Sequence, residues 1–333
     1  MNMLVNGEWR VGAYESTNDE GEFDRQETTF RNRIEDDPDA EFPAESGRYH
    51  LYVSYACPWA HRTLLVRSLK GLEDAISVSV VDPFREDDGW EFSPEKEGCT
   101  EGHLHGYEYL RDVYTEADSE FTGRVTVPVL WDKERETIVN NESREIMRML
   151  DTEFDSVANS DVTLYPEGDR DEVDELIDNI YDPINNGVYR AGFAGGQEAY
   201  ERAIDDLFSA LDRYDDLLED RRYLAGPVLT EADVAMFTTL VRFDAVYYTH
   251  FKCNVRRISD YENLGPYLRD LYQTPKVAET VNMSHIKEHY YRSHADLNPK
   301  RIVPVGPELD FEASHDRDEL PGGPPEDVEA PAR

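Results

Sequence analysis

Runs of apolar residues predict a first domain that mixes strands and helices. Residues 49–54 form a β-rich run, and Pro58 then opens a segment in which leucines recur at helical spacing. Residues 76–81 form a second β-rich run. Two strands that flank a helix make a βαβ unit, which favours a parallel strand pair joined by a right-handed crossover.

The β pattern returns further along the chain, at residues 125–131 and 137–139. Asn141 is predicted to cap a helix that starts at Glu142. The order β-α-β followed by β-β-α is a thioredoxin-like layout. We therefore predict a thioredoxin-like α/β domain over residues 48–156.

The second half of the chain has a helical pattern and no convincing strand alternation. Apolar residues recur at helical spacing over residues 173–180 and again over 200–218. Thr230, with a carboxylate three residues on, has the spacing of a structural helix cap, and the apolar run after it predicts a buried helix over 234–246. We therefore predict an all-α domain over residues 157–311.

Polar segments separate and flank these two domains. Residues 1–47 are predicted to be an N-terminal extension. From residue 13 on, this extension is acidic and poor in large aliphatic residues, which predicts an irregular arm that lies over the surface. Residues 151–171 have the composition of a domain linker. Residues 312–333 are acidic and rich in Pro and Gly, which predicts a disordered tail.

The charge of the chain limits the kinds of partner that it can bind. Among 333 residues, 72 are acidic and 34 basic, so the formal net charge is −38. Such a surface repels phosphate backbones and anionic lipid, which argues against nucleic-acid and membrane-surface binding. Only seven of the basic residues are lysines. Because molar salt shortens the Debye length to ~3 Å and relieves self-repulsion, we hypothesise adaptation to a high-salt cytosol, with an ordinary acidic protein as the alternative.

Targeting and cysteine content point to a cytoplasmic protein. The chain has no apolar run of membrane-spanning length, and no basic region followed by an apolar stretch at its N-terminus. Its cysteines, Cys57, Cys99 and Cys253, are an odd and widely spaced set, which argues against a disulfide framework. His103 and His105 near Cys99 show no metal-ligand spacing, so we predict no bound metal.

Cys57 has the sequence context of a reactive thiol. It lies between a predicted strand and Pro58 in the first helical turn, where unpaired amides and the helix dipole stabilise an anion. The pKa of its thiol should therefore be depressed, so that the nucleophilic thiolate is populated near neutral pH, and His61 and Arg62 could reinforce the positive field. A buried structural cysteine is the alternative.

Ala60 stands where a thioredoxin would hold its second cysteine. A mixed disulfide on Cys57 must therefore be resolved by an external thiol, which implies a small-molecule thiol as co-substrate. Cys99 and Cys253 could resolve it in principle, but neither has a comparable context.

Two further segments could contribute to a thiol site. The proline after Val127 begins a strand-like segment, which predicts a cis peptide bond there, with an edge-strand start as the alternative. Glu142 and Ser143 open a helix whose amides and side chains could hold the carboxylate and ammonium groups of a γ-glutamyl moiety. Ordinary helix capping accounts for the same residues without a ligand.

Long ungapped motifs are shared with a known family. They lie at residues 52–54, 57–63, 89–90, 123–132, 141–143, 185–194, 289–291, 298–299 and 302–304. With these motifs the chain resembles the glutathionyl-hydroquinone reductases, the Xi class of glutathione transferases, over roughly residues 1–310. The resemblance implies a thioredoxin-like domain, an all-helical glutathione-transferase domain and a homodimer.

The resemblance also implies roles for single residues. In that family the cysteine matching Cys57 attacks the thioether sulfur of a glutathionyl-hydroquinone, and a second glutathione resolves the resulting mixed disulfide. The tyrosines matching Tyr189 and Tyr290 reach the hydroquinone oxygens, a task that suits a phenol. The positions matching the family's glutathione-holding residues are Trp90, Arg124, Val127, Glu142 and Ser143.

We therefore expect an enzyme that reduces S-glutathionyl-hydroquinones through a Cys57 mixed disulfide. Its thiol is glutathione or γ-glutamylcysteine, which some extreme halophiles use in place of glutathione. A general monothiol transferase acting on mixed disulfides needs the same thiolate but no aromatic pocket, and is the nearest alternative. A non-catalytic, transferase-like binding module is the alternative from a different class.

Overall fold

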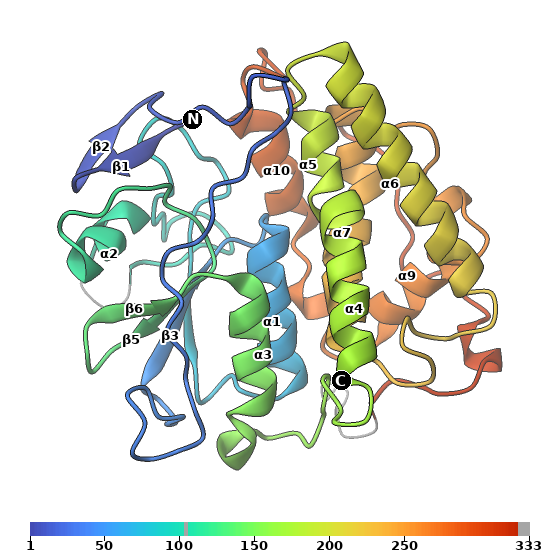
Figure 1. The fold of residues 1–333 in the computed structure, drawn as a ribbon, viewed down its shortest axis with the longest axis horizontal. Coiled ribbons are helices and arrows are strands. Elements are labelled where there is room, and N and C mark those ends of the chain that lie inside the picture. The colour runs from blue at the N-terminus through green and yellow to red at the C-terminus, as the bar shows by residue number, and fades with distance from the viewer. Residues whose placement is uncertain (103–105, 326–333) are drawn as a thin grey trace. The chain divides into compact units, whose positions relative to one another are not determined.

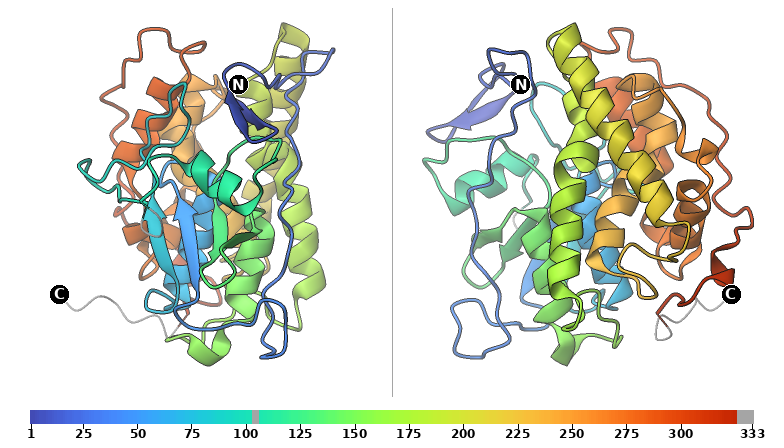
Figure 2. Two further views of the ribbon diagram at one scale, coloured as in Figure 1. Left: turned by 90° about the vertical axis from the view of Figure 1, so that its left-hand side faces the viewer. Right: turned by 45° about the vertical axis from the view of Figure 1, so that its right-hand side comes forward.

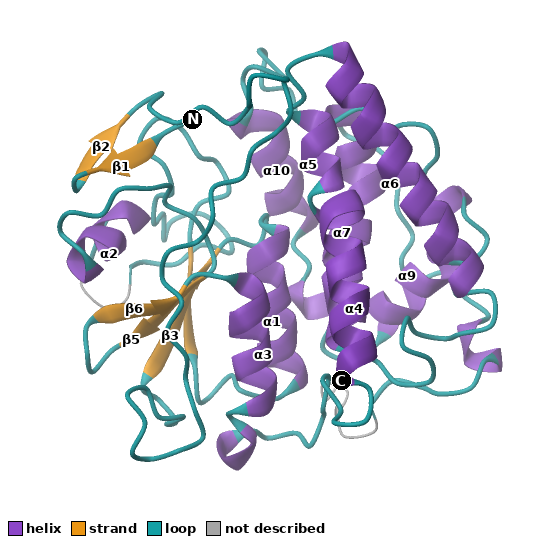
Figure 3. Ribbon diagram, viewed as in Figure 1, coloured by secondary structure: helices purple, strands orange, loops and turns teal. Residues whose placement is uncertain are grey.

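The computed structural model describes residues 1–102 and 106–325, which leaves His103 and His105 outside it. The chain divides into two compact units. Unit 1 comprises Met1–Ser16, Arg25–Asp161 and Asn282–Ile302. Unit 2 comprises Thr17–Asp24, Val162–Val281 and Val303–Arg333. Within the described residues all strands belong to unit 1, whereas unit 2 is built from helices (Figure 3).

The main sheet of unit 1 confirms the predicted thioredoxin-like order. Its strands, in the spatial order β4-β3-β5-β6, are β3 (Tyr49–Val53), β4 (Ser77–Val80), β5 (Val129–Asp132) and β6 (Thr137–Asn140). The pair β3 and β4 is parallel, as expected for a βαβ unit, and the other two pairs are antiparallel. The sheet is central to this unit, because β3 and β5 are buried along their whole length.

The helices of unit 1 are α1 (Pro58–Leu69), α2 (Leu110–Ala117), α3 (Ser143–Thr152) and α10 (Met283–Ser293), with a 3-10 turn at Asp155–Val157. Helices α1 and α3 lie side by side next to the sheet (Figure 1). The sequence pattern did not predict α2, whose apolar residues are too few to stand out from the irregular stretch around it.

The start of α3 corrects the predicted cap by one residue. The helix begins at Ser143, and the Glu142 carboxylate caps it by accepting a hydrogen bond from the Arg144 amide at 3.2 Å. The Asn141 side chain instead accepts from the Phe30 amide at 3.2 Å and donates to the Tyr114 hydroxyl at 3.2 Å. The local pattern assigns the Asn141 side chain to the helix cap, but this side chain is instead used in hydrogen bonds to the N-terminal arm and to α2.

The N-terminal extension begins with a hairpin of β1 (Met3–Val5) and β2 (Glu8–Arg10) that the sequence did not predict. The arm after it is irregular, as predicted, and part of it runs along β6. There the Asn32 amide donates to the Val139 carbonyl at 3.0 Å, and the Asn141 amide donates to the Phe30 carbonyl at 3.1 Å. The arm thereby covers a sheet edge that would otherwise expose unpaired backbone groups.

Unit 2 is helical, as predicted. Its helices are α4 (Arg170–Ile180), α5 (Gly187–Gly192), α6 (Gln197–Leu217), α7 (Glu231–Arg242), α8 (Tyr248–His250) and α9 (Leu264–Gln273). Segments of π-helix lie at Tyr181–Asn185 and Phe243–Tyr247, and 3-10 turns lie at Ile258–Asp260, Ala278–Thr280 and Arg317–Glu319. Helix α5 packs against the long α6, and α4 packs against α7 (Figure 2). Among the described residues no helix combines the length and the apolar character that a membrane crossing requires.

The predicted cap of the buried helix is confirmed. Thr230 is the N-cap of α7 and forms a capping box with Asp233, and every residue of α7 is buried. The Asp233 carboxylate also accepts hydrogen bonds from the Tyr267 hydroxyl at 2.7 Å and from the Leu224 amide at 2.9 Å. Burial nevertheless raises the pKa of Asp233.

The prediction of a disordered tail from residue 312 does not hold for residues 312–325. Arg317 is buried and donates to the Arg221 carbonyl, and Arg222 donates to the Gly322 carbonyl at 2.9 Å. Gly323 forms a β-bridge with Val228. Hydrogen bonds from Arg222 to the tail and from the tail residue Arg317 to the Arg221 carbonyl thus hold this segment, an interaction that acidic, Pro- and Gly-rich composition does not reveal.

Candidate active site

The site begins with Cys57, at the N-terminus of α1. Cys57 is the N-cap residue, Pro58 occupies the first turn, and the Cys57 carbonyl accepts the His61 amide at 3.0 Å. Its side chain is half-buried, and the Sγ atom lies 3.5 Å from the Val127 carbonyl oxygen. The sulfur therefore lies at the end of a helix where amides without intrahelical partners gather.

The Val127–Pro128 peptide bond is cis, as predicted. Strand β5 begins at Val129, directly after the proline, so the sheet ladder does not need the missing N–H. Within residues 1–102 and 106–325, no group accepts a hydrogen bond from the Val127 amide. The backbone of Val127 thus faces Cys57 with a carbonyl and offers an open donor for an extended thiol compound.

The start of α3 supports capping and ligand binding together. Ser143 is buried, and its hydroxyl lies 3.5 Å from a carboxylate oxygen of Glu142. The other oxygen of Glu142 accepts from the Thr28 hydroxyl at 3.2 Å. These contacts hold the Glu142 carboxylate in place at the start of α3, where an ammonium group of a ligand can pair with it.

Helix α10 brings the predicted residues Trp90 and Tyr290 together in unit 1. The His289 ring stacks on Trp90 with centroids 5.0 Å apart and meets Tyr290 edge-on at 5.3 Å. The His289 Nδ1 atom lies 2.7 Å from the Pro83 carbonyl and donates to it, which fixes the orientation of the ring. His289 was not predicted from the sequence, although it adjoins Tyr290 in the shared motif at residues 289–291.

Two arginines of unit 1 lie over tryptophan rings of the same unit. The guanidinium carbon of Arg25 lies 4.0 Å from the centroid of the Trp59 ring, and that of Arg85 lies 5.3 Å from the Trp90 ring. Arg124 is half-buried, and its pKa is lowered to about 10 by burial and by the positive charges of Arg85 and Arg25. Sequence reasoning found Arg124 but neither of the other two, because no spacing in the chain links them.

Tyr189, the remaining predicted catalytic residue, belongs to α5 of unit 2. Its ring has aromatic neighbours at centroid distances of 5.5 to 6.3 Å, namely Phe23, Phe193, Tyr247 and Phe251. Phe23 belongs to the N-terminal arm, whose segment Thr17–Asp24 is part of unit 2. Such a cluster suits packing against a planar aromatic ring. All the other predicted site residues belong to unit 1.

The other two cysteines have a different environment. Cys99 donates to the Val81 carbonyl at 3.7 Å, and burial raises the pKa of its thiol to about 12. Cys253 is fully buried, and burial also raises the pKa of its thiol. Both are therefore protonated and poor nucleophiles at neutral pH.

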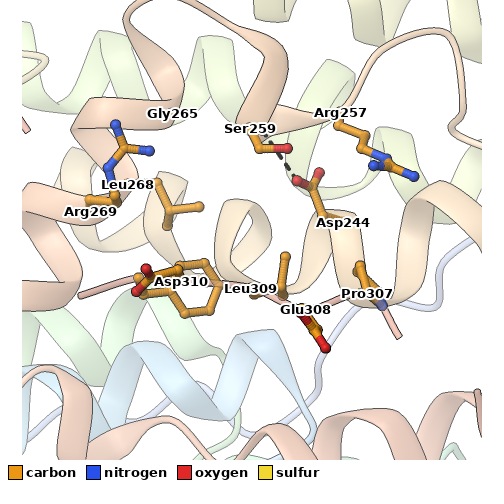
Figure 4. Close-up of a pocket in the computed structure, with 11 residues that line it drawn as sticks. Asp244, Arg257, Ser259, Gly265, Leu268, Arg269, Pro307, Glu308, Leu309 and Asp310 are labelled. Atoms are coloured by element: carbon orange, nitrogen blue, oxygen red, sulfur yellow. Dashed lines mark hydrogen bonds between the residues drawn. The ribbon is translucent and has the colours of Figure 1, made fainter. Parts of the chain in front are cut away.

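A pocket in unit 2 is lined by none of the predicted site residues (Figure 4). In this pocket the Asp244 carboxylate accepts a hydrogen bond from the Ser259 amide at 3.2 Å, which stabilises a short turn. In the part of the chain that the structure describes, no group of three His, Cys, Asp or Glu residues could hold a metal ion.

Comparison with family models matches both halves of the chain. The glutathione S-transferase N-terminal domain matches residues 56–153, and the glutathione S-transferase C-terminal domain matches residues 197–270.

Comparison with single proteins finds much closer likeness. The chain is 50% identical over 324 residues to the glutathionyl-hydroquinone reductase YqjG of Escherichia coli (strain K12), with 96% of this chain and 99% of that protein covered. It is 48% identical to the glutathionyl-hydroquinone reductase PcpF of Sphingobium chlorophenolicum, with 92% and 96% covered.

Solved structures agree. A Xi-class glutathione transferase from Natrialba magadii is 66% identical and superposes with a TM-score of 0.92, with 97% of this chain and 98% of that one covered. The glutathione-bound structure of YqjG from Escherichia coli K-12 is 49% identical, with a TM-score of 0.86 and 95% and 99% covered.

Proposed function

Since this chain belongs to the Xi class of glutathione transferases, the glutathionyl-hydroquinone reductases, we propose that it reduces S-glutathionyl-hydroquinones to hydroquinones at the expense of glutathione. Cys57 is the nucleophile. γ-Glutamylcysteine is the other thiol that we expect to serve as co-substrate.

The reaction balances with one protein sulfur. The Cys57 thiolate attacks the thioether sulfur, so that an S–S bond to glutathione forms and the carbon–sulfur bond breaks. The ring carbon keeps the electron pair and takes a proton, which yields the hydroquinone. A second thiolate then attacks the mixed disulfide, which releases glutathione disulfide and restores the Cys57 thiolate. Two sulfurs are oxidised and one carbon is reduced.

One observation carries the proposal. The Cys57 sulfur lies at the N-terminus of α1, 3.5 Å from the carbonyl of Val127, with Ala60 in the place of a second thiol. The helix terminus favours the thiolate, and the lack of a neighbouring thiol requires the external one.

The remaining site residues then receive the following roles. Val127 pairs through its backbone with the thiol compound, and Trp90 and Arg124 pack against it. Glu142 and Ser143 hold its γ-glutamyl end at the start of α3. Tyr189 and Tyr290 hold the hydroquinone oxygens, which keeps the leaving ring oriented while its carbon takes the proton.

Trapping the intermediate tests this proposal. The protein is mixed with an S-glutathionyl-hydroquinone without free thiol, and intact-mass spectrometry measures the product. We expect one glutathione per chain, removable by dithiothreitol, and none on the Cys57→Ser variant. Cys99→Ser and Cys253→Ser serve as matched controls and should still form the adduct. An adduct on Cys57→Ser would contradict the proposal.

Three broader expectations from the sequence also stay proposals. They are a homodimer, a cytoplasmic location and adaptation to high salt. Thermal unfolding in about 0.1 M and about 3 M KCl tests the last of them, because screening of a −38 charge should raise the melting temperature.

A further inference from the structure

One face of α10 contacts the segment that carries Trp90, residues 82–98, here called the Trp90 segment. His285, His289 and Ser293 follow one another at every fourth position, so they lie on one face of the helix. One ring nitrogen of each histidine lies 2.7 Å from a carbonyl oxygen of the Trp90 segment. The Ser293 hydroxyl accepts a hydrogen bond from a backbone amide of the same segment at 3.0 Å. The helix therefore holds the backbone of this segment at three points.

The ring of His289 also contacts two aromatic side chains. It stacks on Trp90 with centroids 5.0 Å apart and an interplanar angle of 18°, and it meets Tyr290 edge-on at 5.3 Å and 81°. Its Nδ1 atom donates to the Pro83 carbonyl oxygen at 2.7 Å, which fixes the plane of the ring. Stacked and edge-on contacts are the geometries that aromatic pairs favour. One oriented ring therefore restricts the orientation of both neighbours.

The turn that leads into Trp90 is held by a second element, the N-terminal hairpin. The indole N–H of Trp9 donates to the Asp87 carbonyl oxygen at 2.8 Å. Gly89 has a φ of +89°, and a Cβ atom there would approach the Trp9 ring to 3.0 Å, so the turn needs glycine. The hairpin thus fixes the backbone before Trp90, whereas the contact with His289 acts on the ring itself.

We propose that His289 is a positioning residue, which holds the Trp90 ring in the orientation that binds the thiol co-substrate and fixes Tyr290 relative to it. The proposal rests on the proposed function, in which Trp90 packs against the thiol compound and Tyr290 holds a hydroquinone oxygen. A thiol that is conjugated to an aromatic ring uses both residues, whereas a simple mixed disulfide uses only the first. His289 therefore contributes to the preference for aromatic conjugates.

Loss of the stack acts through the rotamers of Trp90. A side chain held in one rotamer is always in the orientation that binds the ligand, whereas a free one is distributed over about three staggered χ1 positions. The apparent affinity for a ligand falls by the populated fraction of the competent state. His289→Ala should therefore raise the Kd for glutathione at least about threefold.

A double-mutant cycle tests whether His289 acts through Trp90. Isothermal titration calorimetry measures the Kd for glutathione without catalysis, in the wild type, His289→Ala, Trp90→Leu and the double variant. We expect His289→Ala to weaken binding in the wild type and to have no further effect when Trp90 is already replaced. The same fold-change in both backgrounds would overturn the proposal, because it would show an effect that does not pass through Trp90.

Two conservative variants separate the ring from its hydrogen bond. His289→Phe keeps a flat ring for the stack and loses the donor to Pro83, whereas His289→Asn keeps a donor and loses the ring. We expect the Phe variant to bind glutathione within about twofold of the wild type and the Asn variant to bind as weakly as His289→Ala. Rescue by Asn and not by Phe would overturn the proposal. This comparison decides the question even where His289→Ala does not fold.

His285→Ala is the matched control. His285 lies one turn earlier on the same face of α10 and contacts the Glu97 carbonyl of the same segment. Its ring lies edge-on to Tyr55, with centroids 5.8 Å apart. We expect the Kd for glutathione to stay within about twofold of the wild type. A loss equal to that of His289→Ala would overturn the proposal, since loosening of the helix would then account for both.

Steady-state kinetics test the link to Tyr290. The substrates are an S-glutathionyl-hydroquinone and the mixed disulfide of glutathione with 2-mercaptoethanol. His289→Ala should lower kcat/KM for the quinone conjugate at least about threefold more than for the mixed disulfide. Equal losses would overturn the link to Tyr290. Weaker glutathione binding in His289→Ala, together with no reductase activity in the wild type, would contradict the proposed function and support the positioning of Trp90.

Discussion

Buried charges are paired within the chain in both units, but not every charged side chain of unit 1 has such a partner. In unit 2, the Asp233 carboxylate accepts from Leu224, Thr230 and Tyr267, and Arg222 pairs with Asp270 through two hydrogen bonds of 2.8 and 2.9 Å. Each buried charge there meets groups of the same chain. Such an arrangement stabilises the folded state once it is complete, and losing one member is costly.

In unit 1 the buried Arg48 also pairs with Asp132, at 2.6 Å, but neither Arg25 nor Arg124 forms an ion pair with a carboxylate among the described residues. Arg124 lies within range of the positive charges of Arg25 and Arg85, which with burial lower its pKa to about 10. The comparison teaches that buried charges with partners in the chain stabilise the fold, whereas charges without a carboxylate partner, such as Arg25 and Arg124, are available to a ligand. Each of the following variants or measurements tests one side of this comparison.

The largest expected effect is on catalysis. Cys57→Ser should lower kcat/KM for an S-glutathionyl-hydroquinone by about 10⁴-fold, because a hydroxyl is not ionised at neutral pH. Thermal unfolding should change little, since serine is nearly isosteric with cysteine, the Cys57 side chain is half-buried, and a hydroxyl can still donate to the Val127 carbonyl 3.5 Å away. Turnover at the native rate in this variant would contradict the mechanism.

The next effect is on stability, in unit 2. Asp233→Ala should lower the free energy of unfolding by at least about 3 kcal/mol, because it leaves several buried donors without an acceptor. Denaturant titration measures the change. Asp205→Ala on the exposed face of α6 is the matched control, and we expect a change within about 0.5 kcal/mol. Equal stability of the two variants would show that the buried network contributes little.

The third prediction separates the reductase from a general monothiol transferase. Tyr189→Phe combined with Tyr290→Phe should lower turnover of the quinone conjugate by about 10²-fold, while turnover of a simple mixed disulfide persists. The phenols are expected to contact only the hydroquinone oxygens. Tyr272→Phe is the control, since Tyr272 stacks on Phe311 at 4.9 Å in unit 2. A parallel loss of both activities would favour the monothiol transferase.

The smallest effect concerns the ionisation of the thiols. Iodoacetamide at neutral pH should label one cysteine, Cys57, and its labelling rate should reach half-maximum below the ordinary thiol pKa of about 8.5. Burial raises the pKa of Cys99 to about 12, so its thiolate is scarce until the pH approaches that value. The Cys57→Ser variant should therefore resist labelling near pH 7. A midpoint at or above about 8.5 for Cys57 would favour the non-catalytic binding module.

Much of the fold was predictable because its signals are local. The strand, Cys57, Pro58 and helix order follows from residues next to one another, and so does the capping box of Thr230 and Asp233. The predicted cap at Asn141 was wrong by one residue, because the arm residue Phe30 binds the Asn141 side chain from far away in the chain. The expectation of disorder failed for residues 312–325, where Arg222 donates to the Gly322 carbonyl and the tail residue Arg317 donates to the Arg221 carbonyl.

By itself the sequence determined the two-part architecture, the family and the acidic composition, since each of these follows from local residue order or from residue counts. Only the tertiary structure decided that Phe23 packs on Tyr189 and that His289 stacks on Trp90. These residues are far apart along the chain, with no periodicity to connect them. Their meeting depends on how the arm and α10 pack, and packing is a property of the whole fold rather than of any segment.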